Sequence, residues 1–264
     1  MTDTTPSSLF LPGLPQGFSV LAYEELGSTN DTARQLAQEG ATHGTVVTAR
    51  RQTAGRGRQG RQWSSQDGNL FCSILLRPDC DLADAANLSF VAALAVRDAL
   101  ALLSGQQLKP QLKWPNDILV NGAKASGLLL ESALQPGSAE RARAEFVILG
   151  IGVNLQHSPD EMLYPATSLA RATEGTVIVP PDQALVSLLT TFEQWYLCWQ
   201  QMGFLAIRES WLDHARGVGQ QIRVSLPHEE MTGRFEGLDS SGALLLRTET
   251  DELVTVTAGD VFFG

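Results

Sequence analysis

One internal segment, in which glycine alternates with arginine, constrains this chain more than any other feature. The sequence QTAGRGRQGRQW occupies residues 52–63, and no aspartate or glutamate occurs between Glu39 and Asp67. Glycine lets a backbone bend tightly, and arginine presents a planar donor fork that matches phosphate and carboxylate oxygens. Apolar, β-branched runs at 44–49 and 69–77 flank the segment. We therefore predict a mobile loop between two strands that closes over a polyphosphate.

Gly/Arg-rich sequence also has a second interpretation, as a solvated tail that binds nucleic acid without sequence preference. Such tails usually repeat and lie at a terminus, whereas this segment is single and internal. The 264-residue chain has a formal net charge of −10, which disfavours wholesale attraction to DNA, RNA or an anionic membrane. An anionic ligand therefore has to meet the local basic patch.

Composition indicates a globular protein, because 43% of the residues are apolar and 18% are charged. The three cysteines have no zinc-site or disulfide spacing, which favours the reduced cytosol, so we predict a cytoplasmic protein. No window approaches the roughly 18 consecutive apolar residues of a membrane span. Residues 1–17 are rich in Thr, Ser and Pro, show no signal-peptide pattern, and are predicted to be a flexible leader.

A helix is predicted over 29–39, directly after an apolar strand candidate. Ser28 fits the N-cap position, and Asp31 three residues later approaches a capping box. The polar side chains of Ser28, Thr29 and Asn30 have two explanations, a simple cap or a contact with a polar ligand at the helix N-terminus. The sequence alone does not separate them.

A β-hairpin is predicted around Asn121-Gly122, a dipeptide typical of two-residue hairpin turns. Strands on both sides would place the segment KWPND, residues 113–117, on the same hairpin as Lys124. Farther on, 145–154 has the composition of a buried strand that ends in GIGVN. Its glycines would let a flat ring lie against the strand, with the Asn154 amide free to contact it or merely ending the strand.

Helical periodicity predicts scaffold helices at 85–103, 182–202 and 204–215. Composition changes after Arg216, where short alternating runs are separated by glycine-rich turns, which suggests a small β-barrel. The predicted strands are 221–226, 231–238, 243–247 and 252–256. We therefore predict three parts, a leader at 1–17, a catalytic domain at 18–216 and a C-terminal domain at 217–264.

Four motifs, taken together, resemble the biotin protein ligase family, also called biotin-[acetyl-CoA-carboxylase] ligases. They are Ser28-Thr29-Asn30, GRGRQGRQW at 55–63, KWPND at 113–117 followed by KASG at 124–127, and GIGVN at 150–154. The resemblance extends from about Leu26 to Gly264. It implies an α/β (α+β) catalytic domain with a mixed sheet and helices, plus a small SH3-like C-terminal β-barrel.

The family resemblance also implies a two-step reaction. Biotin and MgATP give biotinyl-5′-AMP and pyrophosphate, and the biotinyl group then passes to a lysine of a biotin carboxyl carrier protein. Some family members carry an N-terminal DNA-binding domain. The ligase pattern here starts within about thirty residues of Met1, so the resemblance favours a monofunctional enzyme that binds neither DNA nor membrane. The sequence does not decide between a monomer and a homodimer.

Site roles follow from the same resemblance, residue by residue. The implied biotin contacts are Ser28, Thr29, Asn30, Gln52, Arg56, Gly57, Arg58, Lys124 and Gly127. The implied nucleotide contacts are Arg58, Arg61, Trp63, Asn116, Lys124 and Asn154. The implied catalytic residues are Arg58, Lys124 and Asp117, and Asp117 either binds Mg²⁺ or steers the acceptor lysine. Attack of a carboxylate on a phosphate brings two anions together, so cations that absorb the developing charge suit this chemistry.

One departure from the family pattern is Ser126, which adds a hydroxyl near the implied biotin wall. Two other functions remain open beside the ligase. A relative that handles lipoate or octanoate would share the catalytic core, although GRGRxGRxW together with KWPND is not expected there. A sensor that binds biotin without catalysis would not need both Arg58 and Lys124.

Overall fold

The computed structural model describes residues 6–135, 137, 142–159, 164–226 and 228–263, and within these it contains two β-sheets. The larger sheet has eight strands in the order β1-β2-β3-β4-β8-β7-β6-β5. Strands β2 and β3 are parallel, and every other neighbouring pair is antiparallel, which confirms the predicted mixed sheet. Its strands are β1 (Ser7–Ser8), β2 (Ser19–Leu26), β3 (Thr45–Gln52), β4 (Leu70–Leu76), β5 (Gln111–Lys113), β6 (Asp117–Val120), β7 (Ala123–Leu134) and β8 (Ala144–Val153).

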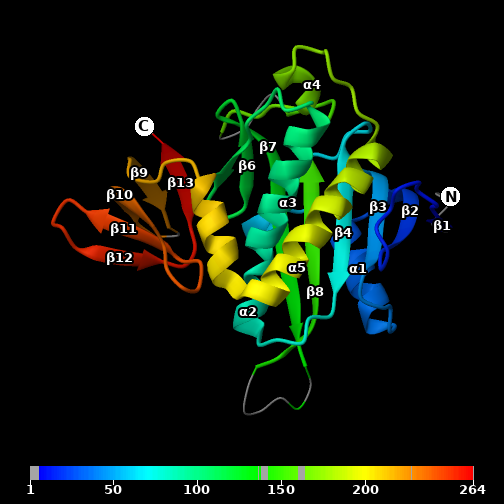
Figure 1. Ribbon diagram of the computed structural model, residues 1–264, viewed down its shortest axis with the longest axis horizontal. Helices are drawn as coiled ribbons and strands as arrows, with labels where there is room; N and C mark the ends of the chain where they lie inside the picture. Colours follow the sequence, from blue (N-terminus) through cyan, green and yellow to red (C-terminus); the bar gives the residue numbers. More distant parts are fainter. Residues whose placement is uncertain (1–5, 136, 138–141, 160–163, 227, 264) are drawn as a thin grey trace.

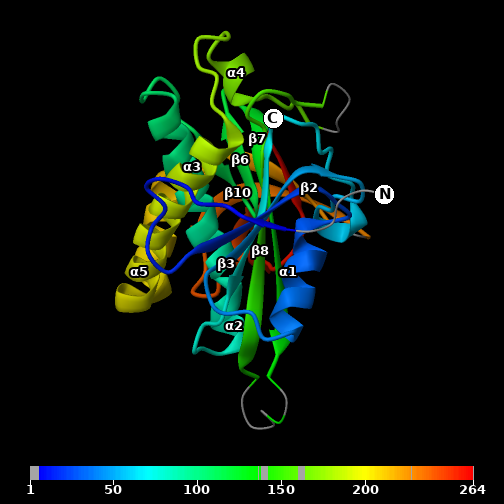
Figure 2. The same ribbon diagram turned by 90° about the vertical axis from the view of Figure 1, so that its right-hand side faces the viewer.

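Helices cover both faces of this sheet, as Figures 1 and 2 show. On one face lie α3 (Leu88–Leu103) and α5 (Pro181–Asp213), and on the other lies α1 (Thr29–Gln38). The larger core lies on the α3 and α5 side, while a smaller cluster containing Ala33 and Ala37 lies under α1. The short helices are α2 (Leu82–Ala86) and α4 (Leu169–Ala172).

The segment Leu82–Leu103 is apolar and long enough to cross a membrane by length and composition, although it contains no run of 18 consecutive apolar residues. In the fold it is a core helix, because 67% of its most apolar window is buried inside the protein. Apolar residues all around a helix are typical of such a central position.

Local signals in the sequence predicted two connections well. Asn121 and Gly122 join β6 to β7 with φ values of 51° and 79°, the left-handed conformation that a two-residue hairpin requires. Gly203 interrupts α5 with φ 72° and ψ −173°, so this element is two helices across a break, as its sequence indicated.

The second sheet is antiparallel, with the order β12-β11-β10-β9-β13. Its strands are β9 (Gln221–Ser225), β10 (Glu230–Leu238), β11 (Leu244–Thr248), β12 (Leu253–Val256) and β13 (Asp260–Phe263). Sequence analysis missed β13 and expected a closed barrel. Among the described residues, β12 and β13 do not pair with each other. The three residues after β12 lead to β13, which pairs with β9 at the other edge of the sheet. The sheet is therefore SH3-like but open.

The structure describes residues 6–17 of the predicted leader. Ser7 and Ser8 form β1 and pair with β2 at the edge of the sheet. Leu11 is buried in the main core at 8% exposure. Backbone pairing and one buried apolar side chain therefore attach this segment to the catalytic domain.

Candidate functional site

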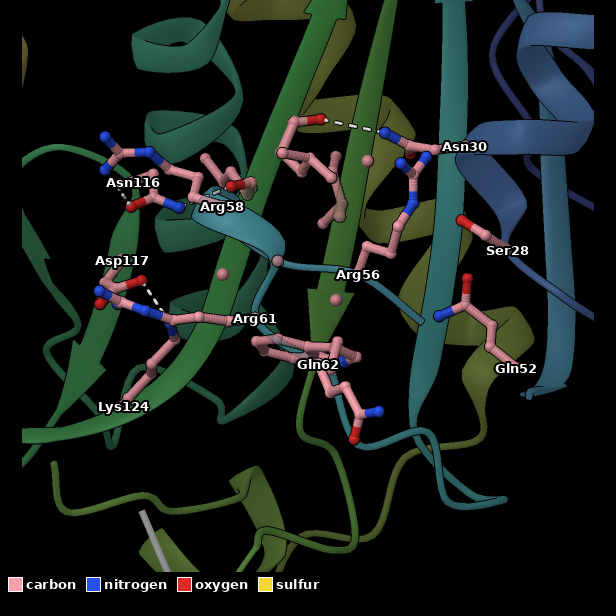
Figure 3. Close-up of a pocket in the computed structure, with 18 of the residues that line it drawn as sticks. Ser28, Asn30, Gln52, Arg56, Arg58, Arg61, Gln62, Asn116, Asp117 and Lys124 are labelled. Atoms are coloured by element: carbon pink, nitrogen blue, oxygen red, sulfur yellow. Dashed lines mark hydrogen bonds and ion pairs between the residues drawn. The ribbon is translucent and has the colours of Figure 1, made fainter. Parts of the chain in front are cut away.

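A cavity of about 310 Å³ opens between the first turn of α1, the Gly/Arg loop and the β6–β7 hairpin. Figure 3 shows its side chains from these separate elements converging on one space. Every site residue predicted from the sequence lines it except Asn154. The lining residues are Ser28, Thr29, Asn30, Gln52, Arg56, Gly57, Arg58, Arg61, Gln62, Trp63, Asn116, Asp117, Lys124, Gly127, Leu128, Leu129, Gly150, Ile151, Gly152, Tyr164 and Asp260.

Neutral polar groups form one end of the cavity, at the start of α1. Ser28 occupies the N-cap position as predicted, but its side chain makes no capping hydrogen bond. The Thr29 backbone N–H instead donates to Gln52 Oε1 at 2.8 Å. The side chain of Gln52 thus takes over the capping function and leaves the Ser28 hydroxyl for the cavity.

Three arginines of the loop also line the cavity. Arg56 lies beside the start of α1, whereas Arg58 and Arg61 lie at the other end. Arg56 pairs with Asp31 on α1, Arg58 donates to Asn116 Oδ1 at 3.2 Å, and Arg61 pairs with Asp260 on β13. These partners come from three elements that are distant in the sequence. They hold the loop over the cavity.

The loop also has an ordered backbone of its own. Gly57 N–H donates to the Arg61 carbonyl at 2.7 Å, and Trp63 N–H donates to Gly55 O at 2.9 Å. Between them a single 3₁₀ turn spans Arg58–Gly60, with Gly60 at φ 73°. Gly55 is required by packing, since a Cβ there would lie 2.7 Å from the Trp63 carbonyl oxygen.

The hairpin supplies a compact group of charges, visible at the lower left of Figure 3. Lys124 Nζ lies 2.6 Å from Asp117 Oδ1, and Lys113 Nζ lies 3.9 Å from Asp117 Oδ2. The described residues contain no cluster of three His, Cys, Asp or Glu side chains that could hold a metal. Asp117 is therefore placed to orient Lys124, and it could serve a metal only as a single carboxylate.

The flat ring that lies against Gly152 of β8 is the indole of Trp63, whereas the sequence suggested a ligand ring there. Gly127 and Gly152 face each other across β7 and β8. Added Cβ atoms at these positions would lie 2.8 Å and 2.4 Å from the Trp63 ring. The indole belongs to the protein, so these glycines make room for the loop anchor, and the indole remains part of the cavity wall.

Asn154 and Ser126 are not among the residues that line the cavity. Asn154 is buried at 3% exposure and donates through Nδ2 to the Thr167 carbonyl at 3.1 Å, so it does not reach the cavity. Its amide supports the turn after β8. Ser126 is fully buried and donates to the Gly152 carbonyl at 2.7 Å, so its hydroxyl does not alter the wall.

The electrostatic character of the cavity follows from these contacts. Four cationic side chains, Arg56, Arg58, Arg61 and Lys124, line it against two carboxylates. Burial lowers the pKa of Arg58, although nearby Asp260 and Asp117 oppose that shift. A guanidinium remains charged at neutral pH, so the cavity has an excess of positive charge for an anionic ligand.

Sequence reasoning missed two acidic residues that organise the site. Glu131 contacts Arg56 from β7, and Asp260 enters from the C-terminal sheet. Strand alternation could have found Glu131, because it lies on the same face as Gly127 and Leu129. Nothing local indicated Asp260, since its contact with Arg61 joins residues 199 apart in the sequence.

Comparison with known proteins identifies relatives for both sheets. Residues 23–154 match the biotin/lipoate A/B protein ligase family, and residues 217–264 match the biotin protein ligase C-terminal domain. The chain is 42% identical over 240 residues to the biotin-[acetyl-CoA-carboxylase] ligase of Paracoccus denitrificans, covering 90% of this chain and 97% of that protein. The chain belongs to the biotin protein ligase family. The family resemblance seen in the sequence is thus confirmed.

Other family members extend the comparison. The Bacillus subtilis bifunctional ligase/repressor BirA is 36% identical over 94% of this chain and 75% of its own length. Among solved structures, biotin protein ligase from Aquifex aeolicus in complex with biotin and ATP has a TM-score of 0.75 and 28% identity. That alignment covers 92% of this chain and 97% of the Aquifex chain. The shared fold therefore includes both sheets.

Proposed function

We propose that this chain is an ATP-dependent biotin protein ligase that forms biotinyl-5′-AMP and transfers biotin to a lysine of a biotin carboxyl carrier protein. The observation that carries the proposal is the cavity itself, which joins a neutral polar end to a cationic end. Biotin has the matching polarity, with a ureido ring at one end and a carboxylate at the other.

The two ends divide the binding work. We assign the ureido ring to Ser28, Thr29, Asn30 and Gln52, and the carboxylate to the Arg56–Arg58 segment and Lys124. The apolar middle of the ligand would lie against the wall that includes Leu128 and Ile151. This direction brings the reactive carboxylate to the side of the cavity that carries Arg58 and Lys124.

The first chemical step joins two anions. A biotin carboxylate oxygen attacks the α-phosphorus of ATP, the bond to the bridging oxygen breaks, and pyrophosphate leaves. Negative charge grows on the transferring phosphoryl oxygens, so positive groups held in place lower the barrier. Lys124 is such a group, because the hairpin and Asp117 fix its ammonium at 2.6 Å.

In the second step the ε-amine of the carrier lysine attacks the biotinyl carbonyl carbon, and AMP leaves. The amide forms as the mixed anhydride bond breaks, and the amine loses a proton. Closure of the 53–63 loop would keep water from this anhydride before the carrier arrives. Its three arginine anchors supply the means of closure.

Magnesium fits the site only when ATP phosphates supply part of its coordination. Mg²⁺ is commonly bound by one or two carboxylates together with substrate phosphates. Asp117 is one carboxylate at the cavity, and its close partner is Lys124. Mg²⁺ would neutralise charge on the phosphates, and Asp117 would hold it.

The acceptor and the setting are further parts of the proposal. A carrier protein in the cytoplasm is the expected partner, and binding of DNA is not expected. The net charge of −10 supports this view, because the positive charge of the site is local. A measurement of mass in solution would distinguish a monomer from a homodimer.

The first experiment is exchange of labelled pyrophosphate into ATP with purified protein and Mg²⁺, without carrier. We expect exchange that requires biotin. Exchange with lipoate instead of biotin would move the chain to the lipoate branch of its family, and biotin binding without exchange would favour a sensor. Adding a carrier domain and its lysine-to-arginine variant then tests the transfer step.

A further inference from the structure

We propose that Tyr164 contacts the nucleotide of the proposed reaction, and that its hydroxyl donates a hydrogen bond to a phosphate oxygen. The inference rests on the proposed function, which brings ATP to the cationic end of the cavity. Tyr164 belongs to none of the four sequence motifs, yet it is one of the residues that line the cavity. Its ring, its backbone and its hydroxyl each support this role.

The ring of Tyr164 is held by both β-sheets. Lys113 Nζ, on β5 of the larger sheet, lies 3.8 Å from the centroid of the ring. Phe262, on β13 of the second sheet, has its ring centroid 5.0 Å from that of Tyr164, at an interplanar angle of 35°. An aromatic ring is attracted both by a cation over its face and by a neighbouring ring. The two sheets together therefore fix where the ring lies.

The backbone that follows Tyr164 is tied to Lys124. Lys124 N–H donates to the Pro165 carbonyl at 2.7 Å, and Thr167 N–H donates to the Lys124 carbonyl at 2.9 Å. These two bonds join the segment to β7 at the residue whose ammonium we assign to the transferring phosphoryl group. The chain thus carries Tyr164 to the side of the cavity where phosphate charge develops.

The hydroxyl of Tyr164 is buried, and no described residue forms a hydrogen bond with it. Burial raises the pKa of Tyr164 to about 12, so the hydroxyl keeps its proton at neutral pH and remains a donor. Nearly all buried polar groups in folded proteins have a partner, because a buried donor without one costs free energy. A ligand that brings an acceptor to this side of the cavity would supply the missing partner.

The charges around the ring favour an anionic acceptor. Lys113 Nζ lies 3.9 Å from Asp117 Oδ2, while Asp117 Oδ1 pairs with Lys124. Asp260 is likewise paired with Arg61. The two carboxylates near the ring are thus matched by cations. A phosphate oxygen carries negative charge and no hydrogen of its own, so it can accept from the phenol beside these cations in a charge-assisted hydrogen bond.

The test compares ADP with adenosine as inhibitors of biotin-dependent pyrophosphate exchange, because the two share base and sugar and differ in their phosphates. Tyr164→Phe removes one oxygen and keeps the ring. We expect the inhibition constant of ADP to rise roughly tenfold, while that of adenosine and the dissociation constant of biotin change less than about twofold. The free variant should unfold at a temperature no lower than the wild type, since a buried hydroxyl without a partner is lost.

Phe262→Leu tests the same contact by a second route, because it removes the ring against which Tyr164 packs. The ratio of the ADP and adenosine inhibition constants should rise as in Tyr164→Phe, by a smaller factor. The double variant should match Tyr164→Phe, because both changes act on one hydrogen bond. Tyr196→Phe is the matched control, since Tyr196 is also buried and stacked on Phe192 at 5.8 Å, but outside the cavity. Its ratio should equal that of the wild type.

A folded Tyr164→Phe protein that keeps the wild-type ratio, or that loses affinity equally for ADP and adenosine, would overturn the inference. Weaker binding of biotin with unchanged inhibition by ADP would also overturn it, because the hydroxyl would then serve the biotin carboxylate. If Tyr164→Phe does not fold, the ratio in Phe262→Leu decides. A wild type without biotin-dependent exchange contradicts the proposed function and this inference together. Exchange in the wild type with an unchanged ratio in Tyr164→Phe contradicts only the role of Tyr164.

Discussion

The two ends of the cavity are built in different ways. At the polar end Ser28, Thr29 and Asn30 are 4%, 4% and 3% exposed and are carried by a helix packed on a sheet. At the cationic end the Arg61 side chain is 52% exposed and belongs to a loop. Buried hydrogen-bonded groups are expensive to rearrange, whereas exposed ion pairs are weak. One end is thus preformed, and the other can exchange its partners for a ligand.

Lys124 lies at the cationic end, but on strand β7 and not on the loop. Replacing it therefore tests whether a cation held by a strand contributes to adenylate formation. Lys124→Ala should lower biotinyl-AMP formation at least about a hundredfold, because a fixed cation is lost where phosphoryl charge develops. Pyrophosphate exchange measures this effect. Lys109→Ala, an exposed lysine away from the cavity, is the control. Normal adenylate formation by Lys124→Ala would contradict the assignment.

Gly150→Ala tests the rigidity of the polar end. The new methyl group would collide with Asn30 Oδ1 at 2.2 Å. We expect biotin affinity to fall at least about tenfold and unfolding free energy by about 1–3 kcal/mol, as for other overpacked cores. Calorimetry and thermal unfolding measure the two effects. Gly27→Ala, where an added Cβ meets nothing within 4 Å, should change neither. Unchanged affinity in Gly150→Ala would show that this end adapts.

Arg58→Gly tests the movable end. Arg58 contacts Asn116 at 3.2 Å and closes the loop over the cavity. Its loss should weaken retention of the adenylate, so released biotinyl-AMP should label bystander lysines about tenfold faster. Biotin incorporation into serum albumin without carrier measures this leak. Arg50→Gly removes an exposed arginine outside the cavity and should release biotinyl-AMP at the wild-type rate. If the Arg58→Gly protein releases biotinyl-AMP no faster than the wild type, other residues retain the adenylate.

Asp260→Asn tests the contact between the loop and the second sheet. The pair with Arg61 is partly exposed, so its loss should cost at most about 1 kcal/mol. Amide hydrogen exchange in the 53–63 loop should accelerate up to about fivefold, with exchange in the core strands unchanged. Asp251→Asn, which removes an exposed partner of Arg247, is the control. If amide hydrogen exchange in the 53–63 loop is equally fast in Asp260→Asn and Asp251→Asn, Asp260 does not hold the loop closed.

The same contact has a pH dependence of known sign. Burial raises the pKa of Asp260, but its hydrogen bond to Arg61 and the charge of that residue outweigh burial and leave the pKa below the usual 3.8. A lowered pKa in the folded state stabilises the closed loop above pH 3.8, and this stabilisation is lost as pH falls through the lower value. NMR titration should show the Asp260 pKa rising in Arg61→Gln. An unchanged pKa would mean that Arg61 does not stabilise the carboxylate.

Much of the fold was predictable because its signals are local. Alternation and periodicity located the strands and helices, Asn121-Gly122 predicted the hairpin turn, and Gly203 predicted the break in α5. The missed strand β13 has only four residues, and its pairing with β9 is not encoded nearby. Closure of a barrel likewise depends on distant strands, and here β13 pairs with β9 and not with β12.

The sequence by itself determined the family, the composition of the cavity and the position of its glycines, because motif residues and backbone requirements are local. Only the tertiary structure decided which of these groups are free to bind. It showed that Asn154 supports a turn, that Trp63 lies on the paired glycines, and that Asp260 holds Arg61. It also placed Glu131 beside both Asn30 and Arg56. Hydrogen-bond partners are chosen by proximity in space, which residue types and spacing do not specify.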